Sequence, residues 1–254
     1  MNLPRLPTMR LDGKRALVTG AGRGIGLAAA AALAQVGADV TLAARSAAEI
    51  EEVARMIRDE GGTATALVLD VTDLAALDAV FSDAEPFDVL VNNAGTNRPA
   101  HFLDVRMEDF DEVIRLNLRA NFAVAQRVAR GMRAAGRGGS IIQMSSQMGH
   151  VGGANRTVYC ASKHAIEGLT KAMAIDLGPH GIRVNTICPT YIETPLTRPF
   201  FQDTNFSNEV IRRIKLGRIG QIEDIMGAVV FLASEASALT TGSALMVDGG
   251  WTAE

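Results

Sequence analysis

The sequence predicts an α/β protein with a Rossmann-like, doubly wound parallel sheet of about seven strands flanked by helices. Short apolar segments alternate with helical patterns from Arg15 to Val247. The strand segments are apolar throughout, which is typical of parallel strands buried on both faces. A glycine-rich turn follows the first of them. No repeat or low-complexity linker interrupts the chain, so we expect a single domain over residues 1–254.

The first half of the chain contains four expected strands, over 15–19, 39–44, 64–69 and 87–91, and three expected helices, over 24–35, 47–60 and 74–84. Glycines stand where the helices should end, at Gly37 and at Gly61 with Gly62. Glycine is favoured there because the residue after a helix often takes a left-handed conformation.

The second half continues the alternation. A long helix is expected over 107–135, a strand over 140–144, a helix over 157–177, a strand over 182–187, short helices over 208–215 and 223–234, and a last strand over 244–247. The least regular stretch, 189–207, contains three prolines and three phenylalanines. Residues 194–216 are therefore predicted to form a flap over the substrate.

Composition limits the class of protein. Apolar residues make up 48 % and charged residues 21 % of the 254 residues, as in ordinary globular proteins. A net charge of −3 gives no general attraction to nucleic acid. No apolar run reaches the ~18 residues of a membrane span. The first residues lack the apolar core of a signal peptide, so a cytoplasmic protein is expected.

Cysteine and histidine give no sign of a disulfide or a metal site. The two cysteines, Cys160 and Cys188, lie in apolar or helical surroundings and are expected to be reduced, buried thiols. The four histidines lack the spacing of metal ligands, so no metal is expected; they are His101, His150, His164 and His180.

The turn after the first strand reads Thr-Gly-Ala-Gly-Arg-Gly-Ile-Gly over residues 19–26. Its glycines allow the backbone to approach a pyrophosphate, and the following helix offers free N–H groups. The strict G-x-G-x-x-G spacing is absent, but the position between a strand and a helix supports dinucleotide binding. The expected contacts are Gly20, Arg23, Gly24, Ile25 and Gly26.

The end of the second strand indicates which dinucleotide is preferred. NAD-binding units usually place a carboxylate there, on the ribose 2′-hydroxyl. This chain has Ala44 and Arg45 instead, and Arg45 is placed to pair with a 2′-phosphate. Arg23 is the second candidate cation, since two guanidiniums suit a phosphate dianion. NADP(H) is therefore the expected cofactor, with NAD(H) possible.

A tyrosine and a lysine stand four residues apart in the expected helix over 157–177. This spacing places Tyr159 and Lys163 on one helix face, where an ammonium can stabilise a phenolate and lower the phenol pKa. Ser146 follows the fifth strand, and Asn-Asn-Ala-Gly over residues 92–95 ends the fourth. The carboxyl ends of parallel strands are where α/β proteins bind ligands.

With these motifs, Asp70-Val71, Asn117 and the closing Val-Asp-Gly-Gly over residues 247–250, the chain resembles the short-chain dehydrogenase/reductase family along nearly its whole length. The resemblance implies that Ser146 holds the substrate oxygen and that Tyr159 exchanges its proton. It implies that Lys163 lowers the Tyr159 pKa and that Asn117 holds a water that relays protons.

The resemblance also implies the remaining cofactor contacts. Asp70 and Val71 would contact the adenine and Asn92 its ribose region, while Ile192 and Thr194 would contact the nicotinamide carboxamide. Further contacts are expected from Ala94, Gly95, Tyr159, Lys163 and Pro189. One departure is Thr190, which follows Pro189 where the family commonly has glycine.

The substrate side is expected to be polar, with contacts from Ser146, Gln147, Arg156 and Tyr191. Such a wall suits a polyol, a keto-sugar or a sugar acid better than a hydrocarbon. A 3-oxoacyl-thioester (acyl carrier protein) reductase is the alternative enzyme, and a non-catalytic cofactor-sensing protein the alternative of another class. Family members of this length are often homotetramers, so a homotetramer is expected.

Overall fold

The computed structural model describes residues 3–82 and 84–253. It contains one seven-stranded parallel sheet in the order β3-β2-β1-β4-β5-β6-β7, which confirms the predicted fold class. The strands are β1 Arg15–Thr19, β2 Asp39–Ala44, β3 Thr63–Val68, β4 Val89–Asn92, β5 Gly139–Met144, β6 Ile182–Pro189 and β7 Ala244–Val247. The strand order reverses between β1 and β4, which are hydrogen-bonded neighbours, and ligands bind at such points.

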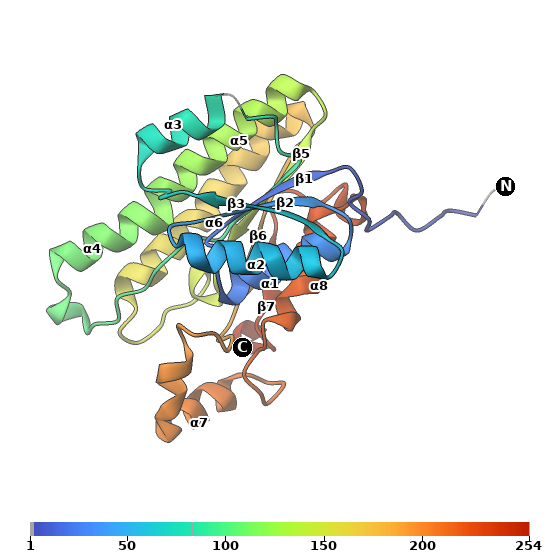
Figure 1. Ribbon diagram of the computed structural model, residues 1–254. Helices are drawn as coiled ribbons and strands as arrows, with labels where there is room; N and C mark the ends of the chain where they lie inside the picture. Colours follow the sequence, from blue (N-terminus) through green and yellow to red (C-terminus); the bar gives the residue numbers. More distant parts are fainter. Residues whose placement is uncertain (1–2, 83, 254) are drawn as a thin grey trace.

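Helices cover both faces of the sheet (Figure 1). One face carries α1 Gly24–Gln35, α2 Ala47–Asp59 and α8 Glu223–Ala233; the other carries α3 Leu74–Ser82, α5 Asn121–Ala135 and α6 Thr157–Leu177. Leu17 and Val18 of β1 are fully buried and belong to the cores on opposite faces. Among the described residues, no helix combines the length and apolar character that crossing a membrane requires.

The helix expected over 107–135 is divided. It consists of α4 Met107–Ile114, a π-helical segment Arg115–Ala120, and α5. Asn121 explains the change, because its Nδ2 donates to the carbonyl oxygens of Leu116 and Asn117 at 3.4 and 2.7 Å. π-Helical turns are rare in proteins, and those that occur often lie at functional sites. Asn117 lies inside this one.

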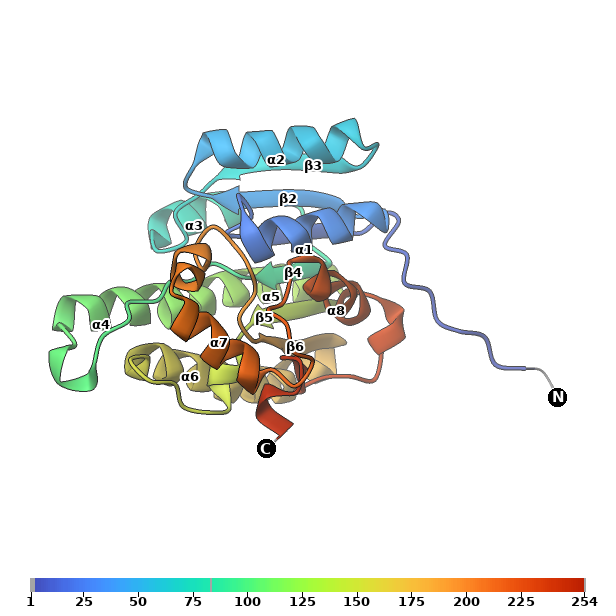
Figure 2. The same cartoon turned by 90° about the horizontal axis from the view of Figure 1, so that it is seen from below.

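The flap contains more regular structure than expected. A 3-10 turn, Arg198–Gln202, precedes α7 Thr204–Arg213, which projects from the helix layers (Figures 1 and 2). The helix predicted over 208–215 thus begins four residues earlier and ends two residues earlier. Asp203 caps it by accepting hydrogen bonds from the N–H groups of Asn205 and Phe206. The helix predicted over 74–84 ends at Ser82, and Asp83 lies outside the described residues.

Candidate active site

The glycine-rich turn joins β1 to α1 where the strand order reverses. Gly20 and Gly24 have φ values of +63° and +56°, and a Cβ on Gly26 would overlap the carbonyl oxygen of Gly20. Both features favour glycine over any other residue. No side chain of the described chain caps the first turn of α1. Its N–H groups are therefore available, and the turn fits the pyrophosphate of a dinucleotide.

Asn93, which the sequence interpretation omitted, ties this turn to β4. Its Nδ2 donates to the carbonyl oxygens of Thr19 and Gly20 at 3.0 and 3.2 Å. The Thr19 hydroxyl accepts from the N–H groups of Asn93 and Ala94 at 2.9 and 3.0 Å. Asn92 is buried with both ends of its amide bonded inside the chain. It supports the turn, and its contact with the cofactor ribose stays a prediction.

Two arginines stand near the end of β2, where the adenosine end of a dinucleotide would lie. Arg23 forms an ion pair with Glu49, Nη1 to Oε1 3.4 Å, and both side chains are exposed. Exposed pairs of this kind are weak, so a phosphate can compete for Arg23. Arg45 has no ion-pair partner within residues 3–82 and 84–253. Burial acts to raise the pKa of Asp70, but hydrogen bonds from Thr72 and the charge of Arg45 hold it below its usual value.

The other predicted cofactor residues lie along the same edge of the sheet. Thr194 sits against the glycine-rich turn, since its methyl carbon is 3.2 Å from where a Cβ on Gly24 would be. Gly95 faces the Oδ1 atom of Asn117, with 3.3 Å to the position of its missing Cβ. Pro189 is the last residue of β6, and Val71 and Ile192 are buried.

Ser146 follows β5 and begins a 3-10 turn over Gln147–Gly149. Its Oγ accepts from the N–H of Met148 at 3.1 Å and donates to Oε1 of Gln147 at 2.8 Å. Both Ser146 and Gln147 are buried. The Gln147 amide oxygen thus fixes the direction of the Ser146 hydroxyl.

Tyr159 and Lys163 lie on α6, with the Lys163 Nζ atom 5.5 Å from the centroid of the Tyr159 ring. Lys163 is only 5 % exposed, and its Nζ donates to the carbonyl oxygen of Met144, the last residue of β5, at 2.7 Å. This bond fixes the ammonium between the helix and the sheet. The predicted pairing of phenol and ammonium on one helix face is present.

The expected lowering of the Tyr159 pKa is not found. Burial raises the pKa of Tyr159 to about 12, although a hydrogen bond with Ser146 acts in the other direction. Burial also lowers the pKa of Lys163 to about 8, against the charges of Cys188 and Glu167. The reason is desolvation, which disfavours the charged form of both groups. The i, i+4 spacing gave the proximity of the two groups but not their burial.

Asn117 anchors the π-helical segment to the loop after β4. Its Oδ1 accepts from the N–H of Thr96 at 2.8 Å, and its Nδ2 donates to the Thr96 carbonyl at 2.9 Å and to Ser162 Oγ at 3.1 Å. Ser162 in turn donates to the carbonyl of Tyr159 at 2.7 Å. Asn117 therefore reaches Tyr159 through one intervening hydroxyl. Both polar atoms of the Asn117 side chain are hydrogen-bonded within the chain. A water that relays protons would therefore have to bind the Asn117 backbone, and this role stays a prediction.

The raised pKa of Tyr159 gives a pH prediction. Alcohol oxidation needs the phenolate and ketone reduction needs the phenol. With a pKa of about 12, the phenolate fraction rises with pH while the phenol remains the dominant form. We therefore expect kcat/KM for oxidation to increase over about pH 7–10, and kcat/KM for reduction to stay nearly constant over the same range. Both directions are measured with a substrate that does not itself ionise in this range. An oxidation rate independent of pH would contradict the assignment of Tyr159 as the ionising group.

Arg156 lies beside Tyr159 in the wall of the candidate site. It is 8 % exposed, and its guanidinium carbon is 5.5 Å from the centroid of the Phe200 ring. Its Nη1 donates to the carbonyl of Asn155 at 3.2 Å. Burial raises the pKa of Tyr191, and the charge of Arg156 opposes this, as it also does at Tyr159. Within the described parts of the chain, no carboxylate lies within ion-pair distance of Arg156.

Two aromatic side chains of the flap, together with Trp251, pack around Tyr191. Its ring is 6.2 Å from Phe201, 5.7 Å from Phe206 and 5.7 Å from Trp251, centroid to centroid. Tyr191 therefore packs within this cluster, while its predicted contact with substrate stays a prediction. Trp251 was not anticipated from the sequence, because it lies 60 residues further along the chain than Tyr191.

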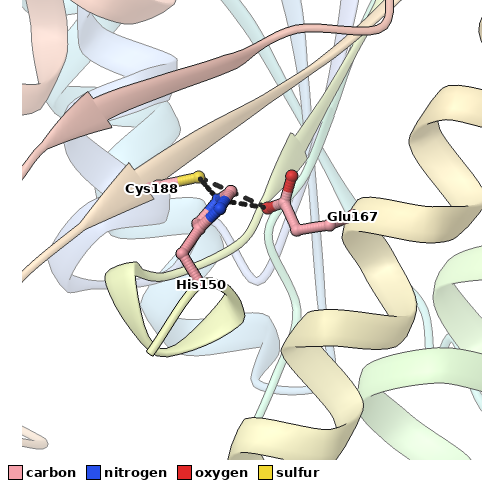
Figure 3. Close-up of side chains that lie close together, drawn as sticks. All are labelled: His150, Glu167 and Cys188. Atoms are coloured by element: carbon pink, nitrogen blue, oxygen red, sulfur yellow. Dashed lines mark hydrogen bonds and ion pairs between the residues drawn. The ribbon is translucent and has the colours of Figure 1, made fainter. Parts of the chain in front are cut away.

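Three residues with no spacing pattern meet behind the candidate site. His150 follows the turn that Ser146 begins, Glu167 lies on α6 and Cys188 lies near the end of β6 (Figure 3). His150 points toward Cys188 and Glu167 in this view. These residues lie on three separate segments and share no regular spacing, so the sequence alone gives no sign that they meet.

Comparison with known proteins identifies the class. The family model described as enoyl-(acyl carrier protein) reductase matches residues 20–252. D-erythrulose reductase of Gallus gallus is 43 % identical over 245 residues, covering 96 % of this chain and 98 % of the relative. Gluconate 5-dehydrogenase of Gluconobacter oxydans is 42 % identical over 246 residues, covering 95 % and 96 %.

A solved structure agrees with these relatives. Gluconate 5-dehydrogenase from Burkholderia cenocepacia, in complex with NADP and tartrate, superposes with a TM-score of 0.93 at 41 % identity, covering 98 % of this chain and 99 % of that one. With the sheet order and the glycine-rich turn, these likenesses define an NAD(P)-dependent oxidoreductase that acts on CH–OH groups. The chain belongs to the short-chain dehydrogenase/reductase family, as its motifs indicated.

Proposed function

We propose that the enzyme interconverts a hydroxyl and a keto group on a polyhydroxy acid, with NADP(H) as cofactor and Arg156 bound to the substrate carboxylate. The observation behind this proposal is Arg156, a buried cation beside Tyr159 that has no acidic partner among residues 3–82 and 84–253. A buried cation without a counter-charge is costly, by several kcal/mol per ion. A carboxylate would remove this cost and could accept two parallel hydrogen bonds from the guanidinium.

Names of the relatives support both an acidic and a neutral substrate. Gluconate 5-dehydrogenase acts on an acid by its name, and the Burkholderia structure contains tartrate. D-erythrulose reductase and the L-xylulose reductases carry the names of neutral sugars. Arg156 favours the acid, because a neutral sugar offers no charge to a buried guanidinium.

A matched substrate panel tests the proposal. Hexonates and hexitols of the same stereochemistry are assayed with NADP⁺, and the corresponding keto-acids and ketoses with NADPH. We expect the acids to have kcat/KM values at least ~30-fold higher, the equivalent of roughly 2 kcal/mol. Equal values for acids and neutral analogues would contradict the proposal. A 3-oxoacyl thioester in the same panel tests the alternative function as a 3-oxoacyl-thioester reductase. We expect this thioester to react poorly.

Proton transfer is assigned to four residues. In oxidation the Tyr159 phenolate would accept the proton of the substrate hydroxyl. The Ser146 hydroxyl would give up its hydrogen bond to Gln147 and donate to the oxygen of that substrate hydroxyl instead. The ammonium of Lys163 would stabilise the phenolate, since it lies next to the Tyr159 ring. Asn117 would position Tyr159 through Ser162. When bound, the nicotinamide accepts the hydride in oxidation and supplies it in reduction. The presence of all four groups also argues against a cofactor sensor without catalysis.

Preference for NADP(H) gives a prediction about Arg45. Arg45→Ala is expected to weaken NADPH binding by about 1.5–3 kcal/mol, the range for hydrogen bonds to a charged group, and to leave NADH binding nearly unchanged. Dissociation constants from fluorescence titration measure both. Arg55→Ala, an exposed arginine of α2 paired with Asp59, is the control. Equal losses for the two cofactors would remove Arg45 from the 2′-phosphate site.

The flap gives a further prediction. Because Phe200 lies against Arg156, substrate binding at Arg156 is expected to order the segment from Thr197 to Ser207. Hydrogen exchange is measured on the free enzyme, with NADPH, and with NADPH and an unreactive acid. Amides of this segment should exchange more slowly in the last state. Equal protection in all three states would make the segment a fixed part of the scaffold.

The homotetramer also stays a prediction.

A further inference from the structure

The group of His150, Glu167 and Cys188 contains none of the residues that would transfer or position the proton, yet it brings together three good metal ligands (Figure 3). Cys188 is fully buried and Glu167 is 6 % exposed. We infer that these three side chains form a zinc site, with the His150 Nε2, one Glu167 oxygen and the Cys188 Sγ as ligands. Imidazole, carboxylate and thiolate are the ligands that zinc uses in proteins.

The ligand atoms already have the spacing of a coordination shell. Cys188 Sγ is 3.4 Å from His150 Nε2 and 3.3 Å from Glu167 Oε1, and His150 Nε2 is 3.5 Å from Glu167 Oε1. Tetrahedral zinc with bonds of ~2.0–2.3 Å separates its ligand atoms by roughly 3.3–3.6 Å. An ion can therefore enter the triangle with little movement of the three side chains. The three protein ligands leave one position for water.

The chemistry of the group also balances. The Cys188 thiol donates to Oε1 of Glu167 at 3.3 Å. Zinc would replace that proton, which is released to solvent, and would be neutralised by the thiolate and the carboxylate. Thr186 Oγ1 donates to the other oxygen, Oε2, of Glu167 at 3.0 Å. Such a partner orients a ligating carboxylate from outside the coordination shell.

Access to the site is through His150. Its side chain is 32 % exposed, whereas that of Glu167 is 8 % exposed. The site would join three segments that carry the proposed active site: the turn after Ser146, α6, and the end of β6 before the flap. Zinc would therefore fix the positions of these segments relative to one another, and with them Ser146 and Lys163, without contacting the substrate.

Cobalt and zinc titrations of the tag-free, chelator-treated enzyme test the inference. Co²⁺ should bind one per chain, with the visible bands of a tetrahedral ion and a near-ultraviolet thiolate-to-cobalt band, and Zn²⁺ should displace it. Cys188→Ser should lose the thiolate band. His150→Gln should weaken Zn²⁺ binding by more than ~100-fold, beyond the 10–100-fold typical of an outer partner.

Matched controls exist in the same helix. Cys160→Ser and His164→Gln alter the other cysteine and an exposed histidine of α6, and both should keep the cobalt spectrum. Circular dichroism shows whether each variant is folded; if Cys188→Ser is not, His150→Gln at the exposed edge still decides. Absence of stoichiometric Co²⁺ binding, or loss of the thiolate band in Cys160→Ser, would overturn the assignment.

Discussion

Replacing Tyr159 with phenylalanine is expected to lower kcat by at least ~100-fold, while NADPH binding remains within a few-fold of the parent enzyme. The change removes only the hydroxyl that exchanges the substrate proton and keeps the ring beside Lys163. Steady-state kinetics in both directions and fluorescence titration of NADPH measure the two effects. A pure loss of kcat is the signature of an interaction that acts in the transition state.

The chain contains two tyrosines, so Tyr191→Phe is the matched control. Tyr191 lies in the aromatic cluster, and its hydroxyl is not assigned to proton transfer. It should change KM more than kcat. If Tyr159→Phe retained turnover within a few-fold of the parent, the acid/base would have to be another group.

Replacing Arg156 with glutamine is the change expected to alter substrate choice most. It should lower kcat/KM for polyhydroxy acids roughly 30-fold or more, because the substrate carboxylate would lose its buried partner. This corresponds to a loss of about 2–5 kcal/mol of transition-state binding energy. Neutral sugars should be affected much less. Arg156→Lys should recover part of the loss, since it keeps the charge but not the forked geometry.

Arg198→Gln is the control for the arginines of this region. Arg198 is exposed on the flap and already paired with Glu193, Nε to Oε1 3.3 Å. A substrate carboxylate therefore has less to gain from it than from Arg156. If Arg156→Gln lowered kcat/KM equally for acids and neutral sugars, Arg156 would support the structure of the site without binding the substrate carboxylate.

Much of the fold was predictable because glycines mark the ends of its elements. Gly37 and Gly61 follow α1 and α2 closely, and both have the positive φ that makes glycine favourable. The start of α7 was missed because Asp203, its cap, lies within a stretch interpreted as irregular. The π-helical segment was missed because it depends on contacts of the Asn121 side chain with carbonyl groups, which leave no periodic signal.

The candidate site was predictable where a motif has local spacing. Tyr159 and Lys163 share a helix, and the glycines of the first turn are consecutive in the chain. Contacts between distant segments left no such signal. Asn93 bonds to a turn more than 70 residues away, and His150 meets Cys188 across 38 residues. The direction of the Tyr159 pKa also depended on burial, which the tertiary structure determines.

A crystal structure of the enzyme with NADP⁺ and a slow or unreactive polyhydroxy acid would show whether Arg156 binds the substrate carboxylate while Ser146 and Tyr159 bind the reacting hydroxyl. We expect the carboxylate to lie on the Arg156 guanidinium, and one substrate hydroxyl to lie within hydrogen-bond distance, about 2.6–3.2 Å, of both Ser146 Oγ and the Tyr159 hydroxyl oxygen. An acid whose carboxylate lies away from Arg156, or a bound substrate with no hydroxyl between Ser146 and Tyr159, would contradict the proposed function.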